Sequence, residues 1–271
     1  INGTLTLIFQ PAEEYGLSDS GAARMIADGL FDKYPCDAVF AMHNAPGYPA
    51  GTLMFREGPA MASSDHVEIT LVGTGGHGGM PHLSSDPVVA AAGLVTALQT
   101  IVSRNVDPQS AAVISVGILH AGTAYGVIPD TARIELSVRA LEPAVRALLE
   151  RRIKELVSSH AASSGVEAKI NYQSGYPPLI NSTSETAFAT EVAIDLVGQD
   201  RVIAPCPAVT GSEDFAFMLE QRPGCYLLIG NGLEGEYHGC MIHTPGYDFN
   251  DANIAVGASY WTELAKRFLV A

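Results

Sequence analysis

The chain has 271 residues, 47% hydrophobic and 16% charged, a composition typical of a globular protein that buries a core in one or two domains. Asp and Glu number 29 against 15 Lys and Arg, and the net charge of −14 argues against nucleic acid or an anionic membrane surface as the main partner. No segment suggests a membrane span or a signal peptide. The four cysteines form no metal-like pair, so we expect reduced thiols in a cytoplasmic protein.

The first part of the chain predicts alternating strands and helices. An uninterrupted apolar run at 5–9 is typical of a strand that is covered on both faces. Residues 19–30 suit a helix that ends near Gly29, and a second apolar run, at 37–43, suits a strand that ends on His43. This order favours an α/β sheet.

The middle part predicts a separate, smaller unit. Residues 65–73 alternate apolar and polar side chains, as a strand with one wet face does. A helix is expected over 86–104, with Asp86 as its N-cap and Pro87 at its first position. The remaining expected elements are strands at 111–120 and 132–140, a helix whose apolar face runs from Val145 to Val157, and a strand at 166–173. This β-α-β-β-α-β order is that of a split βαβ domain.

The last part returns to the first pattern. Ser182 and Glu185 fit a capping box that opens a helix running to about Val197. A helix start in 211–221, a buried strand at 225–230 and a helix over 252–269 are also expected. We therefore expect an α/β fold in which residues 1–60 and 177–271 form one sheet domain, and residues 61–176 form the β-α-β-β-α-β domain inserted into it.

Four residues are candidates for a metal site. Glu13 and Glu14 follow the first predicted strand, His43 ends the second, and His243 lies in the loop after the last. Ligands of α/β sheets bind outside the carboxyl ends of the strands, and a divalent ion would let two adjacent carboxylates stay ionised. One Glu could then bind metal while its neighbour acts on water as a general base. The alternatives stay open, because a Glu pair is equally typical of a helix's first turn, and a single His is more often structural.

Several longer motifs carry a resemblance to a known family. They are "FQPAEE", "GGHGGMPH", "TALQTIVSRNVDP", "VIPD", "GSEDFAF" and "HTPGYDFND", which follow one another over nearly the whole chain. Together they resemble the metal-dependent amidohydrolases of the aminoacylase and hippurate hydrolase type, in the carboxypeptidase-like metallopeptidase clan. The resemblance implies a catalytic α/β domain, an inserted lid domain through which a homodimer forms, and two divalent metal ions. Carboxylate and imidazole ligands suit Zn or Mn, with Co or Ni as alternatives.

The resemblance also implies a role for each candidate residue of the metal site. Glu14, His43 and His243 correspond to metal ligands. Glu13 corresponds to the general base, which takes a proton from a metal-bound water and returns it to the leaving amine.

Further residues resemble those that contact the substrate. His77 of "GGHGGMPH" corresponds to a lid histidine that polarises the scissile carbonyl, often in the partner's site, although the residues alone suggest an idle hairpin tip. His82 is a weaker second candidate. Arg139 corresponds to the residue that holds the substrate carboxylate, although it could instead pair with Glu142.

Three features depart from the family pattern. Relatives carry further Cys and His ligands in a "CGHD"-like motif upstream of the Glu pair, whereas this sequence starts at Ile1 and has none. We therefore expect an N-terminally incomplete chain with an incomplete metal site and poor activity. Gly126 stands where relatives have an Asn that could bind substrate. Glu213 and Asp214 could support the metals from behind the ligands, although N-capping by Ser212 would explain them equally well.

The sequence leaves three functions to compare. The leading one is hydrolysis of the amide bond of a small-molecule N-acyl amino acid. The second is deacetylation of a biosynthetic intermediate such as N-acetyl-diaminopimelate. The third belongs to another class, a non-catalytic fragment or a dimerising binding protein.

Overall fold

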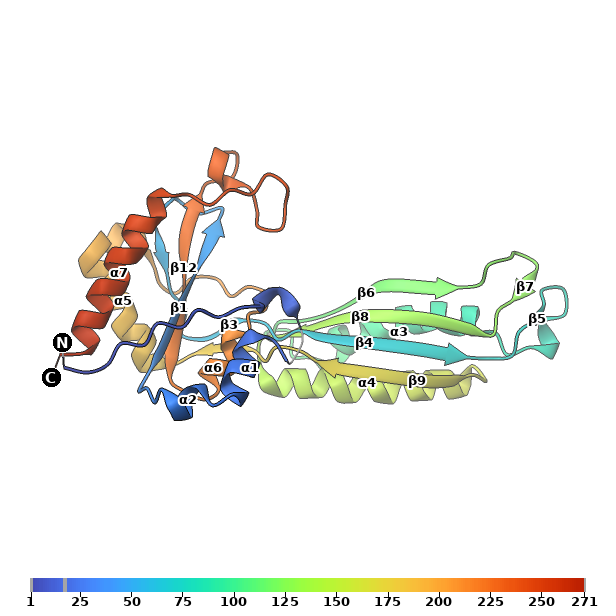
Figure 1. Ribbon diagram of the computed structural model, residues 1–271. Helices are drawn as coiled ribbons and strands as arrows, with labels where there is room; N and C mark the ends of the chain where they lie inside the picture. Colours follow the sequence, from blue (N-terminus) through green and yellow to red (C-terminus); the bar gives the residue numbers. More distant parts are fainter. Residues whose placement is uncertain (1, 17–18, 271) are drawn as a thin grey trace.

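The computed structural model describes residues 2–16 and 19–270. They form a mixed α/β protein with two parts, a layered α/β part and a long arm built on a second sheet (Figure 1). The expected α/β fold class is therefore confirmed.

The α/β part has a four-stranded sheet between two layers of helices. Its strand order is β1 (Val39–Pro46), β12 (Gly224–Gly232), β2 (Leu53–Met54) and β11 (Val202–Ile203), with β1 parallel to β12, β12 antiparallel to β2 and β2 parallel to β11. One face packs on α5 (Thr183–Val197) and α7 (Ala252–Phe268). The other face packs on α1 (Gly21–Ala27), α2 (Leu30–Lys33) and α6 (Phe215–Leu219).

The arm is an antiparallel sheet with helices on one face. Its strand order is β6 (Ala112–Ala121), β8 (Thr131–Ala140), β4 (Asp65–Val72) and β9 (Glu167–Ser174), and α3 (Pro87–Asn105) and α4 (Pro143–Ser163) cover it. Alternate residues of β4 are buried, as the alternating sequence predicts. A short pair, β5 (Gly76–His77) with β7 (Val127–Ile128), lies at the far end of the arm beside a 3₁₀ turn at Pro81–Leu83 (Figure 1).

Two connections join the arm to the α/β part. Residues 62–64 lead into β4, and residues 175–178 lead out of β9 towards β10 (Leu179–Asn181), which pairs with β3 (Gly58–Met61). At this junction the buried carboxylate of Asp65 accepts hydrogen bonds from Arg146 (Nη2 to Oδ1 2.6 Å), the Tyr172 hydroxyl (2.9 Å) and the Gly175 N–H (3.2 Å). The buried charge is thus both paired and hydrogen-bonded, as burial requires. We propose that the inserted domain comprises residues 61–176.

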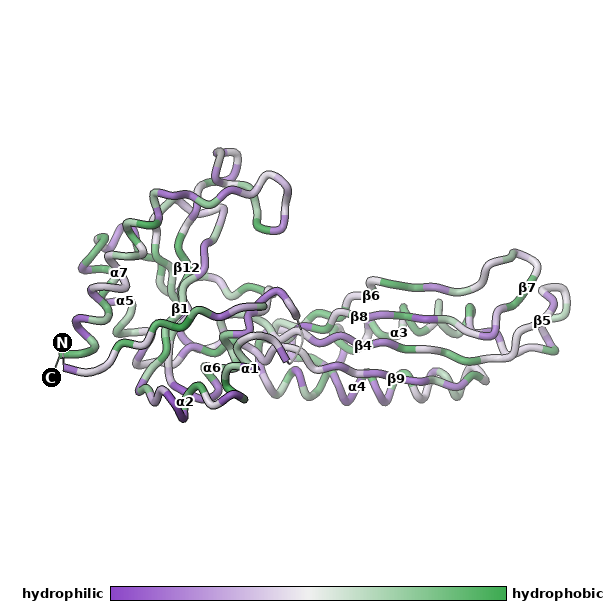
Figure 2. Tube along the Cα trace, viewed as in Figure 1, coloured by the Kyte–Doolittle hydropathy of each residue, from purple (hydrophilic) through white to green (hydrophobic). Residues whose placement is uncertain are grey.

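The buried strand predicted at 5–9 is wrong. These residues have no regular secondary structure, and Leu5, Leu7 and Phe9 are 55%, 70% and 87% exposed. Figure 2 shows the segment as a strongly hydrophobic stretch that crosses the α/β part. A strand needs neighbours for its backbone groups, and no strand within 2–16 or 19–270 pairs with this segment. Leu5, Leu7 and Phe9 therefore stay exposed, whereas Ile8 is partly buried against the core.

Helix α3 corrects the expectation that no segment could span a membrane. By length and composition alone, this helix is long and apolar enough to do so. Its buried side chains, among them Leu94, Leu98 and Ile101, belong to the core of the arm, as in a core helix of a folded domain. The expected N-cap is present, because Asp86 Oδ1 accepts the Val88 N–H at 2.8 Å.

Two local predictions about helix starts are wrong in detail. Ser182 does precede α5, but its hydroxyl accepts the Gly224 N–H at 3.1 Å and makes no capping bond, so the capping box with Glu185 does not form. The hydroxyl is used for a tertiary contact instead. The helix expected within 211–221 is limited to α6.

Candidate active site

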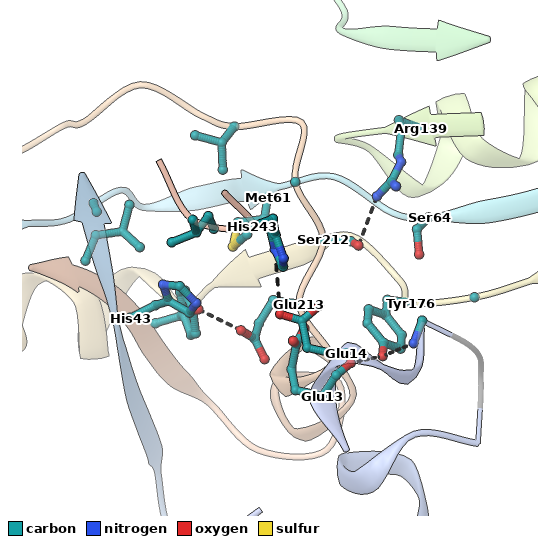
Figure 3. A pocket seen from close by; sticks show the side chains of 18 of the residues that line it. Glu13, Glu14, His43, Met61, Ser64, Arg139, Tyr176, Ser212, Glu213 and His243 are labelled. Carbon is teal, nitrogen blue, oxygen red and sulfur yellow. Dashed lines mark hydrogen bonds and ion pairs between the residues drawn. The ribbon is translucent and has the colours of Figure 1, made fainter. Parts of the chain in front are cut away.

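A cleft of about 730 Å³ lies where the α/β part meets the arm (Figure 3). Its wall brings together residues that are far apart in the sequence, and the predicted candidates among them are Glu13, Glu14, His43, Arg139, Glu213 and His243. The cleft is large enough for a small organic molecule.

The Glu13–Glu14 pair lies on a single 3₁₀ turn, Glu13–Tyr15. The turn neither follows a strand nor opens an α-helix, so both structural expectations for this pair are corrected. Left-handed residues flank it, Ala12 with φ 57° and Gly16 with φ 76°. The left-handed backbone at these two residues turns the chain so that both carboxylates face the cleft (Figure 3).

The carboxyl group of Glu13 lies close to two other acids. Carboxylate oxygens of Glu13, Glu213 and Asp214 all lie within 4.8 Å of one another. Burial raises the pKa of Glu13 to about 7, and the nearby charges of Glu213, Glu14 and Asp214 add to the rise. The site therefore disfavours additional negative charge and favours a cation.

Glu213 and Asp214 have hydrogen-bond donors of their own. Glu213 accepts the Phe215 N–H at 3.0 Å and the Tyr226 hydroxyl at 2.6 Å, and burial raises its pKa. Asp214 accepts the Ala22 N–H at 3.0 Å and a short hydrogen bond from the Gln10 amide. Both carboxylates are buried and already bonded, which suits supports behind a site better than exposed metal ligands.

The three predicted metal ligands all line the cleft but do not form one tight cluster. His43 lies on β1, and its Nδ1 is 2.7 Å from the Asn44 carbonyl oxygen, the arrangement of a histidine that offers Nε2 to a metal. Nε2 of His243 lies 3.6 Å from Oε1 of Glu14. Among the residues described, the triad within 4.8 Å is the acidic one above, and His43 is not part of it.

Asn231 anchors the loop that carries His243, a role that the sequence did not reveal. Its buried side chain donates to the carbonyls of His238 and Asp248, both at 2.9 Å, and accepts the Asn250 N–H at 2.9 Å. These partners lie on both sides of His243, so one side chain fixes the base of the loop. In the sequence this Asn directly follows the strand predicted at 225–230, and nothing there indicates such partners.

Arg139 lies half-buried in the cleft wall. Its guanidinium donates to the hydroxyls of Ser212 (2.9 Å; Figure 3) and Ser137 (3.3 Å). It does not pair with Glu142, which instead accepts a hydrogen bond from Ser110. Ser212 therefore contacts the arm and does not cap α6, which corrects that expectation. Burial lowers the pKa of Arg139.

One side of the cleft is apolar. His43 pairs in register with Leu228 of β12, and Leu228 pairs with Met54 of β2. Directly paired residues share a face of the sheet, and all three line the cleft. Because neighbouring strands lie about 4.8 Å apart, the row of side chains from His43 to Met54 is about 10 Å long. Met61 and Val209 extend the apolar surface.

The candidate residues His77 and His82 lie elsewhere. Both are exposed at the far end of the arm, where Nδ1 of His77 accepts the Gly79 N–H at 3.0 Å. Gly126 is there too, and its carbonyl accepts the Gly78 N–H at 2.8 Å. Figure 1 shows this end of the arm well away from the α/β part. The fold does not bring these residues to the cleft of their own chain.

The donor set of the cleft suits divalent metal ions. Three carboxylates and two imidazoles line it, those of Glu13, Glu14, Glu213, His43 and His243, and Asp214 lies close to Glu13 and Glu213. Burial and the neighbouring carboxylates both raise the pKa of Glu13, so a bound cation would favour its ionised form. Oxygen and imidazole donors of this kind suit Zn, Mn and related ions.

Comparison with known proteins gives consistent matches. Residues 1–267 match the peptidase family M20/M25/M40. A hippurate hydrolase of Campylobacter jejuni is 42% identical over 99% of the chain, and an N-acetyldiaminopimelate deacetylase of Geobacillus sp. is 38% identical over 97%. A solved dinuclear metal binding peptidase of family M20 from Bacillus subtilis superposes on 96% of the chain with a TM-score of 0.77 and 29% identity. The chain spans 68% of each of the two sequence relatives and 64% of the solved one.

Proposed function

We propose, because the chain belongs to the peptidase family M20/M25/M40, that the protein hydrolyses the amide bond of N-acyl amino acids with two divalent metal ions. One observation carries the proposal. Glu13, Glu14, His43, His243 and Arg139 all line the same cleft.

Each of these residues has a task in the proposed reaction. Glu14, His43 and His243 would hold metal, Zn or Mn in the first place, and the ions would supply Lewis-acid activation of water and of the amide carbonyl. Glu13 accepts the proton of the attacking water and delivers it to the leaving amine, which departs as the free amino acid. Arg139 binds the carboxylate of that amino acid.

His77 would serve the cleft of a second copy. It cannot reach its own cleft from the far end of the arm, so a task in the reaction requires another subunit. The outer strand β6 offers a surface for that subunit, since Ile118 and Leu119 are 40% and 48% exposed. We propose a homodimer that forms through the arm and places each His77 near the partner's cleft.

The apolar wall supports a large apolar acyl group. An acetyl group would leave most of the surface from Leu228 to Met54 uncovered, whereas an aromatic acyl group such as the benzoyl of hippurate would cover it. A hippurate hydrolase is also among the relatives. The rival substrate is N-acetyl-diaminopimelate, and the rival class is a protein that dimerises and binds a ligand without catalysis.

A substrate panel distinguishes these functions. The complete gene product, loaded with Zn²⁺ or Mn²⁺, should hydrolyse hippurate faster than N-acetylglycine or N-acetyl-diaminopimelate, and a chelator should abolish the activity until metal is restored. Preference for N-acetyl-diaminopimelate would favour the deacetylase. Tight ligand binding without any metal-dependent hydrolysis would favour the non-catalytic protein.

A further inference from the structure

The turn that carries Glu13 and Glu14 has little support of its own. It is one 3₁₀ turn with no buried residue, and its internal hydrogen bond, from the Tyr15 N–H to the Ala12 carbonyl, is long at 3.4 Å. A short turn of this kind, with left-handed residues at both ends, needs contacts from elsewhere to keep one conformation.

Tyr176 supplies such contacts from 160 residues away. Its hydroxyl accepts the Gly16 N–H at 2.7 Å and donates a short hydrogen bond to the Glu13 carbonyl oxygen (Figure 3). One hydroxyl is thus hydrogen-bonded to the main chain at both ends of the turn. Tyr176 is 2% exposed, so water has little access to replace these bonds.

Tyr176 is itself firmly held. Its ring packs edge-on against Phe217 of α6, with centroids 6.0 Å apart. Its carbonyl accepts the Ser64 N–H at 3.0 Å, which ties together the two connections of the arm. The preceding Gly175 approaches the turn so closely that an added Cβ would lie 3.0 Å from the Gly16 carbonyl oxygen. The hydroxyl is therefore presented from a fixed position.

We propose that Tyr176 is a positioning residue for Glu13 and Glu14. Its hydroxyl bonds the main chain of their turn, and acts by fixing where the two carboxylates point. This role deepens the proposed function, because a general base and a metal ligand on adjacent residues must both keep one orientation. A hydroxyl that satisfies the backbone of the turn achieves this without adding charge to the acidic cleft.

The test is Tyr176→Phe, which removes only the hydroxyl. Amide hydrogen exchange of the full chain, resolved by residue with NMR, should show the Gly16 N–H exchanging about 10-fold faster, the effect of losing one net hydrogen bond. Calorimetric titration with Zn²⁺ should show affinity weaker by about 10-fold or more, the usual scale for groups that orient ligands. Where the complete gene product turns over hippurate, kcat should fall with little change in KM.

Tyr172→Phe is the matched control. It removes a hydroxyl at the same junction, one that bonds Asp65 at 2.9 Å and does not contact the turn. It should lower the thermal midpoint, yet leave Gly16 exchange and Zn²⁺ affinity at wild-type values. The proposal is overturned if Tyr176→Phe leaves Gly16 exchange unchanged, or if Tyr172→Phe has the same effect on it. A complete gene product that binds no Zn²⁺ would contradict the proposed function, while the exchange result would still decide the role of Tyr176.

Discussion

The carboxyl group of Glu13 holds its proton more tightly in the folded chain than in the unfolded one. Its pKa rises from 4.5 to about 7, first because burial disfavours the charged form and then because Glu213, Glu14 and Asp214 repel it. When the folded pKa is the higher one, stability is present below the unfolded value and is lost as the pH rises to the folded value. A bound cation would offset this loss by favouring the ionised carboxylate.

We therefore expect Glu13→Gln to stabilise the metal-free chain above pH 7. The free energy of unfolding, measured in urea with a chelator present, should be similar for the two proteins near pH 4.5. Between pH 4.5 and about 7 the wild type should become the less stable one. The exposed change Glu191→Gln on α5 is the control. Equal stability of wild type and Glu13→Gln at pH 8 would contradict the raised pKa.

The same substitution should separate metal binding from catalysis. In the complete gene product, Glu13→Gln should retain metal and lose on the order of 10²-fold or more in kcat, the usual scale for a positioned proton acceptor. Glu14→Gln should lose metal as well, because a neutral amide is a poor replacement for a ligating carboxylate. Elemental analysis beside hippurate assays measures both effects. Near-normal turnover by Glu13→Gln would remove it from the proposed role.

At the level of secondary structure, the sequence could predict elements whose signals are local. Alternating side chains identify β4, and Asp86 with the following Pro87 marks the start of α3. The apolar run Leu5–Phe9 has an equally clear local signal, yet a strand also depends on neighbours that a single segment cannot reveal.

In the candidate site, too, the sequence predicts local features and misses contacts between remote residues. His43 lies on a strand and His243 on a loop, as the sequence predicts, but β1 continues to Pro46 and does not end on His43. The sequence missed the contacts that hold the site, because their partners are remote in the chain. Gln10 and Asp214 are 204 residues apart, and Gly16 and Tyr176 are 160 apart. Nothing in the local sequence around either partner specifies such a pair.

The row from His43 to Met54 gives a prediction about substrate choice. Leu228→Ala should reduce kcat/KM for hippurate about 10-fold relative to an N-acetyl amino acid, because removing apolar contacts costs a bulky acyl group more than a small one. The measurement is the ratio of kcat/KM for the two substrates. Leu233→Ala, an exposed change outside the cleft lining, should leave the ratio unchanged. An unchanged ratio in Leu228→Ala would place the acyl group elsewhere.

Across the whole molecule, the far end of the arm lies well away from the α/β part (Figure 1), whereas the cleft is lined by residues of the α/β part and of the near end of the arm. In the proposed dimer, each active site would combine Glu13 of one subunit with His77 of the other.

Mixing two defective proteins tests the shared site. Complete His77→Ala and Glu13→Gln proteins should each be nearly inactive. After dissociation and reassembly together, statistical pairing should restore up to about a quarter of the normal activity per site, since each mixed dimer has one intact site. His82→Ala should behave like wild type if His77 is the active one of the pair. No recovery in a sample of proven mixed dimers would mean that His77 does not act in the partner's site.

A small rotation at the junction around Asp65 would produce a large displacement at the far end of the arm. The ten-residue strand β8 alone is about 33 Å long, so a rotation of only about 10° at the junction would move its far end by about 6 Å. A displacement of that size exceeds the reach of any hydrogen bond. The contacts of buried Asp65 with Arg146, Tyr172 and Gly175 therefore determine how accurately the opposite end of the arm is positioned. A substitution that shifts the packing at the junction would therefore displace His77 most, although every residue around His77 is unchanged.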